Sequence, residues 1–290
     1  MKPPPFGYSR PESLEDAVRL LAEFGSDAKV LAGGQSLVPL LSMRLAAPRH
    51  LIDINRVSEL AYVRTDEDKN TVRVGALARQ ADLEHDANAA AVQPLLQQAL
   101  RLVAHPTIRN RGTVVGSLAH ADPASELTAV LAVLGGAVRL ASTRGDRTVP
   151  ADEFFLGPLS TCAAADELVV EASFPGRPPR SGSAFVEISR RHGDYAICGV
   201  AVCVSVDGAG ALRGGKVALI SVGPTPVIVQ LGEAVAGTHP GGDLSDVHDA
   251  VCAAVSPEAD IHASAEYRRQ LAGVLTVRAV REAAQQAAAA

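Results

Sequence analysis

Several features typical of particular protein classes are scarce or missing in this 290-residue sequence. Aromatic residues make up only 3% of the chain, and no basic run is interleaved with them, which argues against nucleic-acid binding. No run of about eighteen consecutive apolar residues occurs, so no transmembrane helix is expected. The opening residues lack the apolar core and cleavage site of a secretory signal, and the sequence therefore predicts a cytoplasmic protein.

Cysteine and histidine are present but are not spaced as metal ligands. The four cysteines, at positions 162, 198, 203 and 252, form no C-x-x-C pair and no iron–sulfur motif. Cys198 and Cys203 fall in a predicted strand, where apolar packing is the expected role. The eight histidines contain no H-E-x-x-H pattern. The sequence thus predicts no metal and no cluster on this chain.

Apolar residues are abundant, at 47% of the chain, which is enough for a full core and, at this length, for two domains. The net charge is −5, with charges of both signs dispersed. The clearest break in composition is residues 175–183, which hold three prolines, two glycines and two serines. This segment predicts a linker or exposed loop.

Hydrophobic periodicity predicts both helices and strands. Before the break we expect strands at 29–32, 51–54, 71–75 and 137–142, and helices at 14–24, about 92–103, and from Asp122–Pro123 to Gly135. After the break, three alternating apolar segments at 184–188, 199–206 and 216–222 predict an antiparallel meander. Two further helices are expected near 244–255 and 263–287.

A pair of glycines, Gly33 and Gly34, joins a predicted strand to a predicted helix. Ser36 is the expected N-cap of that helix, and Pro39 fits its first turn. Its apolar face would be formed by Leu37, Leu40, Leu41 and Leu45. Glycine allows a close backbone approach, and free N–H groups at a helix start bind anions. Taken alone, a tight turn with no ligand is the more common explanation of such a segment.

A second segment with polar and glycine residues, 105–126, lies about eighty residues further on. Thr113 and Ser117 offer hydroxyls, and Asp122 and Glu126 offer acceptors for sugar hydroxyls. Asp122 precedes a proline, so a helix N-cap explains it equally well. Two arginines, 109 and 111, would neutralise phosphate, although such arginines are more often solvated or paired with a neighbouring chain.

Together these two segments resemble the FAD-carrying medium subunit of the molybdenum hydroxylases, which include the carbon monoxide dehydrogenases, xanthine dehydrogenases and aromatic-heterocycle hydroxylases. The resemblance covers almost the whole chain. It extends over residues 6–25, 51–57, 154–162, 167–175, 190–202 and 266–280.

The resemblance implies an α+β fold with an FAD-binding domain of the vanillyl-alcohol oxidase (PCMH) type at residues 1–177. This domain would contain two α/β subdomains, at about 1–56 and 57–177. An antiparallel sheet with helices would form a C-terminal domain at 178–290.

The resemblance also assigns residues to FAD, and it assigns no catalytic residue. The first segment would hold the pyrophosphate through Val30, Leu31, Ala32, Gly33, Gly34, Gln35, Ser36 and Leu37. The second would contribute Thr113, Val114, Gly116, Ser117, Asp122 and Glu126. Leu168 and Tyr195 would lie near the flavin ring, although from the sequence alone an ordinary buried strand explains Leu168 better, and a turn also explains Tyr195.

One position departs from the family pattern, because Val115 stands where related chains usually have glycine. A β-branched residue resists positive φ and adds bulk. Either the backbone at this position has an ordinary φ and tolerates the side chain, or the loop is displaced and FAD binds more weakly.

The implied function is electron transfer. A large subunit with a molybdenum cofactor would oxidise the substrate, a small subunit would carry two [2Fe–2S] clusters, and FAD on this chain would pass electrons to a terminal acceptor. The assembly would be a dimer of heterotrimers. Two alternatives stay open: an assembly subunit with weakened or lost FAD, and a free-standing flavin reductase. Carbon monoxide, purines, aromatic heterocycles and aldehydes all remain possible substrates.

Overall fold

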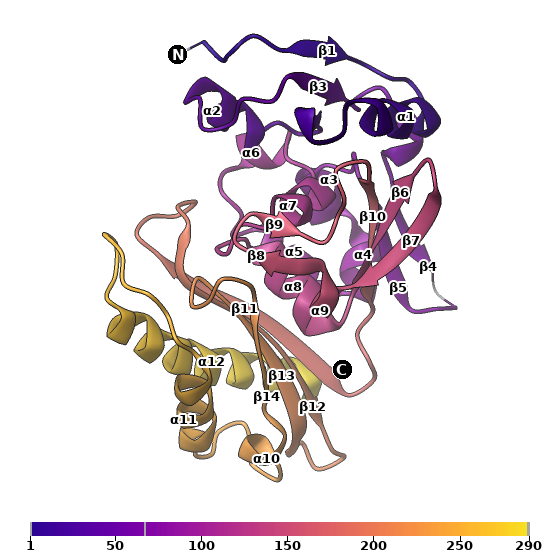
Figure 1. Ribbon diagram of the computed structural model, residues 1–290. Coiled ribbons are helices and arrows are strands. Elements are labelled where there is room, and N and C mark those ends of the chain that lie inside the picture. The colour runs from indigo at the N-terminus through magenta and orange to yellow at the C-terminus, as the bar shows by residue number, and fades with distance from the viewer. Residues whose placement is uncertain (1, 67, 289–290) are drawn as a thin grey trace.

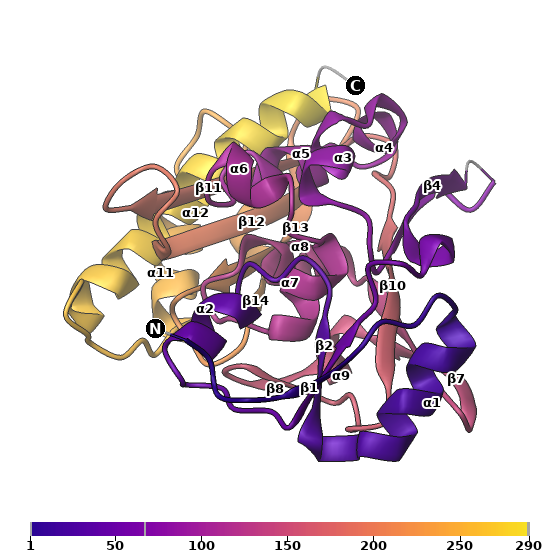
Figure 2. The same ribbon diagram turned by 90° about the horizontal axis from the view of Figure 1, so that it is seen from above.

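The computed structural model describes residues 2–66 and 68–288, and it confirms the α+β class. Its three larger sheets follow one another along the molecule, the N-terminal sheet at the top of Figure 1 and the C-terminal sheet at the bottom. A small hairpin of β8 (Phe155–Gly157) and β9 (Ser160–Thr161) accompanies the middle sheet. Seen from above in Figure 2, helices α7 and α8 lie between the N-terminal strands and the long C-terminal helix.

The N-terminal sheet is parallel, with the order β1 (Gly7–Ser9), β3 (His50–Asp53), β2 (Ala28–Leu31). Helix α1 (Leu14–Phe24) precedes β2, and a short 3₁₀ turn at Gly25–Asp27 joins them. The Ser13 side chain accepts from the Asp16 N–H at the start of α1, and Gly25, with φ of 52°, ends it. The predicted helix at 14–24 is therefore confirmed.

The middle sheet is antiparallel throughout. Its order is β4 (Val63–Asp66), β5 (Thr71–Gly75), β10 (Leu168–Pro175), β6 (Ala137–Ser142), β7 (Gly145–Pro150). A 3₁₀ turn at Ser58–Leu60 precedes it. Its helices are α3 (Gln80–His85), α4 (Ala87–Val92), α5 (Pro94–Leu100), α6 (Pro106–Arg109), α7 (Val114–His120), α8 (Glu126–Leu134) and α9 (Ala151–Phe154).

The C-terminal sheet is the predicted meander with one additional strand. Its order is β11 (Ser181–Ser189), β12 (Ala196–Val206), β13 (Leu212–Ile220), β14 (Val227–Gln230). The helices that follow are α10 (Gly232–Val235), α11 (Ser245–Ala254) and α12 (Ala265–Ala288). Helix α12 packs on β11 and β12, and α11 packs on α12. Both predicted C-terminal helices are confirmed.

The C-terminal sheet is buried on both faces, which joins it to the middle unit. Val200 and Val202 belong to the core under α12, whereas Ala201, between them, belongs to the core shared with the middle unit. Helix α8 packs on β12 and β13 from that second side. The seam between α8 and this sheet is therefore a site where side chains from distant parts of the sequence meet.

Four local predictions were wrong at their ends. The helix expected at 92–103 breaks at Gln93, because Pro94 disfavours helical backbone before it and begins α5. The helix expected from Asp122 begins at Glu126, since the Asp122 side chain instead accepts from the Ala124 N–H at 2.8 Å and closes its own turn.

The two other errors concern α2 (Leu37–Ser42) and the expected linker. Helix α2 ends before Leu45, which is 72% exposed, so the predicted four-leucine face does not form. The linker is shorter than 175–183, because Pro175 still pairs with Thr71 in β10 and Ser181 already belongs to β11. Only residues 176–180 connect the two strands.

Candidate functional site

The first predicted segment lies at the carboxyl ends of two parallel strands, β2 and β3. After Leu31 the chain turns through residues 32–36 into α2. Gly34 has φ of 75°, a conformation that side-chain-bearing residues rarely adopt. Its carbonyl accepts from the Val38 N–H at 2.9 Å. Carboxyl ends of parallel strands, followed by a helix start, are a common ligand crevice.

Gly33 brings the two predicted segments into contact. A Cβ atom at this position would lie 2.5 Å from the Arg111 carbonyl oxygen and 2.8 Å from Gly112 Cα, so only glycine allows the approach. The guanidinium of Arg79 reinforces the contact by donating to the Arg111 carbonyl at 2.8 Å. Residues that are far apart in sequence therefore form one wall of a single site.

Two residues that the sequence analysis missed, Asn55 and Asp53, hold the first turn in place. The Asn55 amide donates to the Ala32 carbonyl at 2.8 Å and to Asp53 Oδ1 at 2.6 Å, and its oxygen accepts from Arg79 at 2.8 Å. Although burial alone would raise it, hydrogen bonds from Tyr8 and Asn55 hold the pKa of Asp53 below its usual range. A signal was present, because Asp53 and Asn55 lie at the end of the predicted strand 51–54. Arg79 gave no such signal.

A pocket of about 390 Å³ opens beside this turn. Its lining residues are Leu31, Ala32, Gly33, Gly34, Gln35, Val38, Pro39, Asp53, Asn55 and Arg111. Within residues 2–66 and 68–288, no protein group accepts a hydrogen bond from the N–H groups of residues 33–36. Four backbone donors and the charge of Arg111 are thus available to an anion.

The remaining first-segment residues lie around the pocket rather than in its lining. Val30 is half-buried in β2, paired with Ile52, and Leu37 is the first residue of α2. Ser36 occupies the position before α2, as expected, but its hydroxyl accepts no capping hydrogen bond.

Residues of the second segment mostly support α7. The Thr113 hydroxyl accepts from the Gly116 N–H at 3.0 Å, and a Cβ at Gly116 would lie 2.4 Å from that oxygen. Val114 is fully buried, and the Ser117 hydroxyl is hydrogen-bonded to the Ser125 hydroxyl at 2.9 Å. Thr113 and Ser117 thus already have protein partners for their hydroxyls.

Val115 fits the fold without strain. It lies in helix α7, outside the residues with positive φ, and is only 2% exposed within the apolar core. The side chain therefore points into the core. Of the two possibilities that the sequence left open, the structure shows an ordinary φ at position 115 and a valine side chain that fits there, rather than a displaced loop.

Arg109 does not serve as a free phosphate ligand. Its guanidinium is buried and makes two bonds to the Glu84 carboxylate, at 2.7 and 3.1 Å. A third bond goes to the Val103 carbonyl at 2.9 Å. The expectation that Arg109 neutralises phosphate was wrong, and pairing within the chain explains this residue.

The acidic residues of the second segment meet a tyrosine from the C-terminal sheet. Glu126, the first residue of α8, is 9% exposed. Burial, and to a smaller extent the charge of Asp122, raises the pKa of Glu126 to about 7, although a hydrogen bond from its own backbone N–H acts to lower it. Tyr195 is 73% exposed. Partial desolvation and the charges of Asp122 and Glu126 raise the pKa of Tyr195. These three predicted residues therefore lie in one neighbourhood.

The loop that carries Tyr195 docks on the start of the second segment. Gly193, with φ of 84°, lies against His105, where a Cβ would come within 2.5 Å of the imidazole. Leu168, by contrast, is 3% exposed in β10 and paired with Ala141 in the core. Its position fits the ordinary buried strand that the sequence left open.

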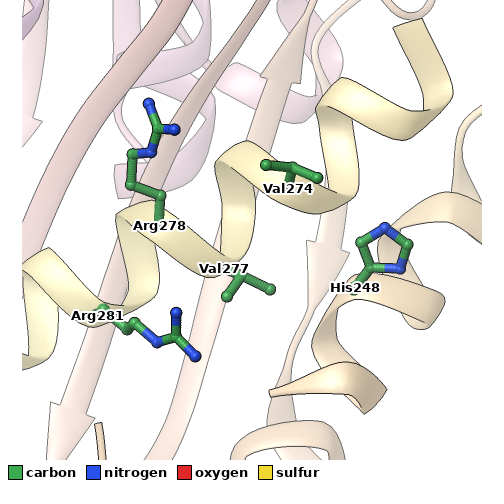
Figure 3. Close-up of a pocket in the computed structure, with 5 residues that line it drawn as sticks. All are labelled: His248, Val274, Val277, Arg278 and Arg281. Atoms are coloured by element: carbon green, nitrogen blue, oxygen red, sulfur yellow. The ribbon is translucent and has the colours of Figure 1, made fainter. Parts of the chain in front are cut away.

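A second hollow, of about 380 Å³, lies between α11 and α12 (Figure 3). It is lined by His248, Val274, Val277, Arg278 and Arg281. These two helices contain none of the residues assigned to FAD, so this hollow is separate from the loops described above. In the part of the chain that the structure describes, no three His, Cys, Asp or Glu residues are grouped to hold a metal ion. None of the helices described there is long and apolar enough to cross a membrane.

Comparison with known proteins agrees with this geometry. Residues 4–177 match the FAD-binding domain in molybdopterin dehydrogenase, and residues 183–283 match the CO dehydrogenase flavoprotein C-terminal domain. The 6-hydroxypseudooxynicotine dehydrogenase complex subunit alpha of Paenarthrobacter nicotinovorans is 41% identical over 98% of this chain and 96% of its own length. The carbon monoxide dehydrogenase medium chain of Hydrogenophaga pseudoflava is 37% identical, over 98% of both chains.

Solved structures give the same result. Quinoline 2-oxidoreductase from Pseudomonas putida 86 superposes with a TM-score of 0.92 at 36% identity, covering 99% of each chain. Carbon monoxide dehydrogenase from Hydrogenophaga pseudoflava gives 0.90 at 37% identity, again over 99% of each chain. The chain belongs to the FAD-binding medium subunits of the molybdenum hydroxylases, and it is the electron-transfer subunit of such an oxidoreductase complex.

Proposed function

We propose that the pocket beside Gly33 holds the FAD pyrophosphate. The observation that carries this proposal is the set of four backbone N–H groups at residues 33–36, which have no acceptor among the residues that the structure describes, together with Arg111. Backbone donors at a turn and helix start suit a double negative charge, and the pocket is preformed by bonds from Asn55 and Arg79. The residues present therefore fit the cofactor.

The rest of the assigned set would bind the other parts of FAD. Asp122 and Glu126 are acceptors for ribityl or ribose hydroxyls, and Tyr195, exposed at the edge of this region, is suited to a flavin face. We infer that Thr113, Val114, Gly116 and Ser117 act by shaping α7 rather than by donating side-chain bonds. Leu168 has the weakest support, because its side chain is buried in the core.

FAD supplies the conversion between one- and two-electron chemistry, and the residues of this chain bind it, orient it and limit its contact with water. The family works with a large and a small partner subunit. We infer that the small subunit brings two [2Fe–2S] clusters close to this chain, and that the large subunit holds the molybdenum cofactor. We further propose a dimer of heterotrimers in the cytoplasm, with residues 1–177 as the FAD-binding domain and 178–290 as a C-terminal domain.

The test is to purify the chain with its partner subunits, denature it, and identify the released nucleotide by mass and visible spectrum. We expect about one FAD per chain. Gly33→Ala should release little or none, because its Cβ would collide with the Arg111 carbonyl. Gly241→Ala is the matched control, since no atom of residues 2–66 or 68–288 lies within 4 Å of a Cβ there and its φ is ordinary.

Two other outcomes would favour the alternatives. An intact complex whose medium subunit is colourless would contradict the FAD proposal and support an assembly subunit. A flavin-loaded chain that purifies only as a single subunit and reduces its own substrate would support a free-standing flavin reductase.

A further inference from the structure

A chain of hydrogen bonds runs from the edge strand of the N-terminal sheet to both walls of the pocket beside Gly33. Tyr8, on β1, donates its hydroxyl to Asp53 Oδ2 at 2.5 Å. Asp53 Oδ1 accepts from the Asn55 backbone N–H at 2.9 Å and from the Asn55 side chain at 2.6 Å. Asp53 therefore uses each of its two oxygens for a different neighbour.

The Asn55 side chain links the two walls of the pocket. Its amide donates to the Ala32 carbonyl at 2.8 Å, and its oxygen accepts from the Arg79 guanidinium at 2.8 Å. A second nitrogen of Arg79 donates to the Arg111 carbonyl at 2.8 Å. Ala32 begins the glycine turn, Arg111 belongs to the segment that faces it, and both residues line the pocket. The orientation of Asn55 therefore fixes the separation of these two segments.

Asp53 is an acidic residue in the lining of a pocket that suits an anion. It is 7% exposed, and its charge would repel the phosphates of a bound dinucleotide unless other groups offset it. The Tyr8 hydroxyl donates to Oδ2, and Arg10 Nε lies 3.6 Å from the same oxygen. Tyr8 and Arg10 thus place a donor and a positive charge on the Asp53 oxygen that Asn55 leaves free.

The sheet, rather than a loop, holds Tyr8 in place. Strand β1 pairs in parallel with β3, where Tyr8 lies opposite Leu51, and the Ser9 hydroxyl is hydrogen-bonded to the His50 imidazole at 2.8 Å. The Tyr8 side chain is itself half-exposed, so its main contribution is the hydroxyl contact rather than packing of the ring. A donor fixed in this way restricts the orientation of the Asp53 carboxylate.

We propose that Tyr8 is a positioning residue for FAD, which acts through Asp53 and Asn55 to set the separation of the glycine turn and the Arg111 segment. The inference rests on the proposed function, in which the pocket between these two segments holds the pyrophosphate. It means that β1, whose residues lie outside the pocket lining, governs how tightly the cofactor is held. Walls that are preset before binding lose less freedom when the ligand arrives.

The test is a titration of FAD onto the deflavinated complex of this chain with its partner subunits, followed by quenching of flavin fluorescence. Tyr8→Phe removes the hydroxyl and keeps the ring, so the Kd of FAD should rise by about three- to twentyfold, because a hydrogen bond to a charged group is lost at one remove from the ligand. Tyr267→Phe is the matched control and should leave the Kd unchanged. Tyr267 is 48% exposed, against 51% for Tyr8, and its hydroxyl has no hydrogen bond within residues 2–66 and 68–288.

Two further readouts separate positioning from a general effect on folding. In an Asn55→Ala background, Tyr8→Phe should raise the Kd little further, because the link from Asp53 to the turn is already missing. The phosphorus nuclear magnetic resonance signals of bound FAD report directly on the pyrophosphate. They should shift in Tyr8→Phe and stay in place in Tyr267→Phe.

The outcomes distinguish the role of Tyr8 from the proposed function. An unchanged Kd for Tyr8→Phe, fully additive effects of Tyr8→Phe and Asn55→Ala, or phosphorus signals that match those of the unaltered protein would each overturn the role of Tyr8. An unaltered complex that binds no FAD would instead overturn the proposed function itself.

Discussion

The side-chain N–H of Asn55 donates to the Ala32 carbonyl oxygen at 2.8 Å, and the side-chain oxygen Oδ1 of Asn55 accepts from the Arg79 guanidinium at 2.8 Å. The glycine turn is thereby held by Asn55, by Arg79 through Asn55, and by the backbone of Arg111, which lies against Gly33. A turn held in this way loses little further freedom when a ligand binds.

Replacing Asn55 should weaken FAD binding without unfolding the protein. Asn55→Ala removes the bonds to Ala32 and Arg79, and a loss of about 1.5–3 kcal/mol corresponds to a rise in the Kd of FAD of about 10- to 100-fold. The Kd can be measured by flavin fluorescence. Asn88→Ala, at an exposed position on α4, should leave the Kd unchanged. Equal values of the Kd for Asn55→Ala and Asn88→Ala would show that the turn does not depend on this side chain.

The buried pair of Arg109 and Glu84 should matter for stability rather than for charge at the pocket. Glu84→Leu leaves the Arg109 guanidinium buried without its counter-charge and should lower the free energy of unfolding by about 3–5 kcal/mol. The double variant, Arg109→Leu with Glu84→Leu, should regain part of this loss. Urea unfolding followed by circular dichroism measures both values. A double variant no more stable than the single variant would refute the pairing argument.

Val115→Gly separates two explanations of the departure from the family pattern. The variant removes a core side chain and places glycine in α7, so the free energy of unfolding should fall by about 2–4 kcal/mol. FAD content should not increase. A gain in bound flavin after this change would instead support a loop that valine displaces.

Stability should depend on pH through Glu187 of β11, because burial, and to a smaller extent the charge of Glu126, raises the pKa of this carboxyl to about 8. The group keeps its proton up to about pH 8 when folded but ionises near pH 4.5 when unfolded. The folded state thus binds more protons between these values, and the free energy of unfolding falls as pH rises through that window. Glu187→Gln removes this loss, so its Tm should exceed that of the unaltered protein by at least about 2 °C at pH 8.5 but not at pH 4.5. Parallel Tm curves for the two proteins would contradict the raised pKa of this carboxyl.

Much of the architecture was predictable because it is encoded locally. Helix α1 has a Ser13 cap, a buried stripe and a terminal Gly25, and strand β6 was expected at its observed bounds. The glycine turn was predictable for the same reason, since its residues are consecutive. The expected α+β class and the family assignment are both confirmed.

What could not be predicted depends on contacts between distant residues. Arg79 supports the pocket by reaching Arg111 and Asn55, and nothing in its neighbouring sequence indicates this. Ser221 of the C-terminal unit donates its N–H to the Pro123 carbonyl at 2.9 Å, and the sequence around neither residue indicates this contact. Asp122 was misassigned as a cap because its sequence suits both a helix start and the isolated turn that it forms.

The fit of Gly33 against the Arg111 carbonyl has a consequence for how such subunits diverge. The contact is with backbone atoms of residues 111 and 112, so it restricts the side chain at position 33 whatever side chain stands at position 111. A chimera that takes residues 1–56 from one relative and the remainder from another should therefore keep this contact as long as residue 33 is glycine and the backbone at 105–113 keeps its course. Position 33 is therefore expected to stay glycine in evolution even where the side chains of the facing segment change.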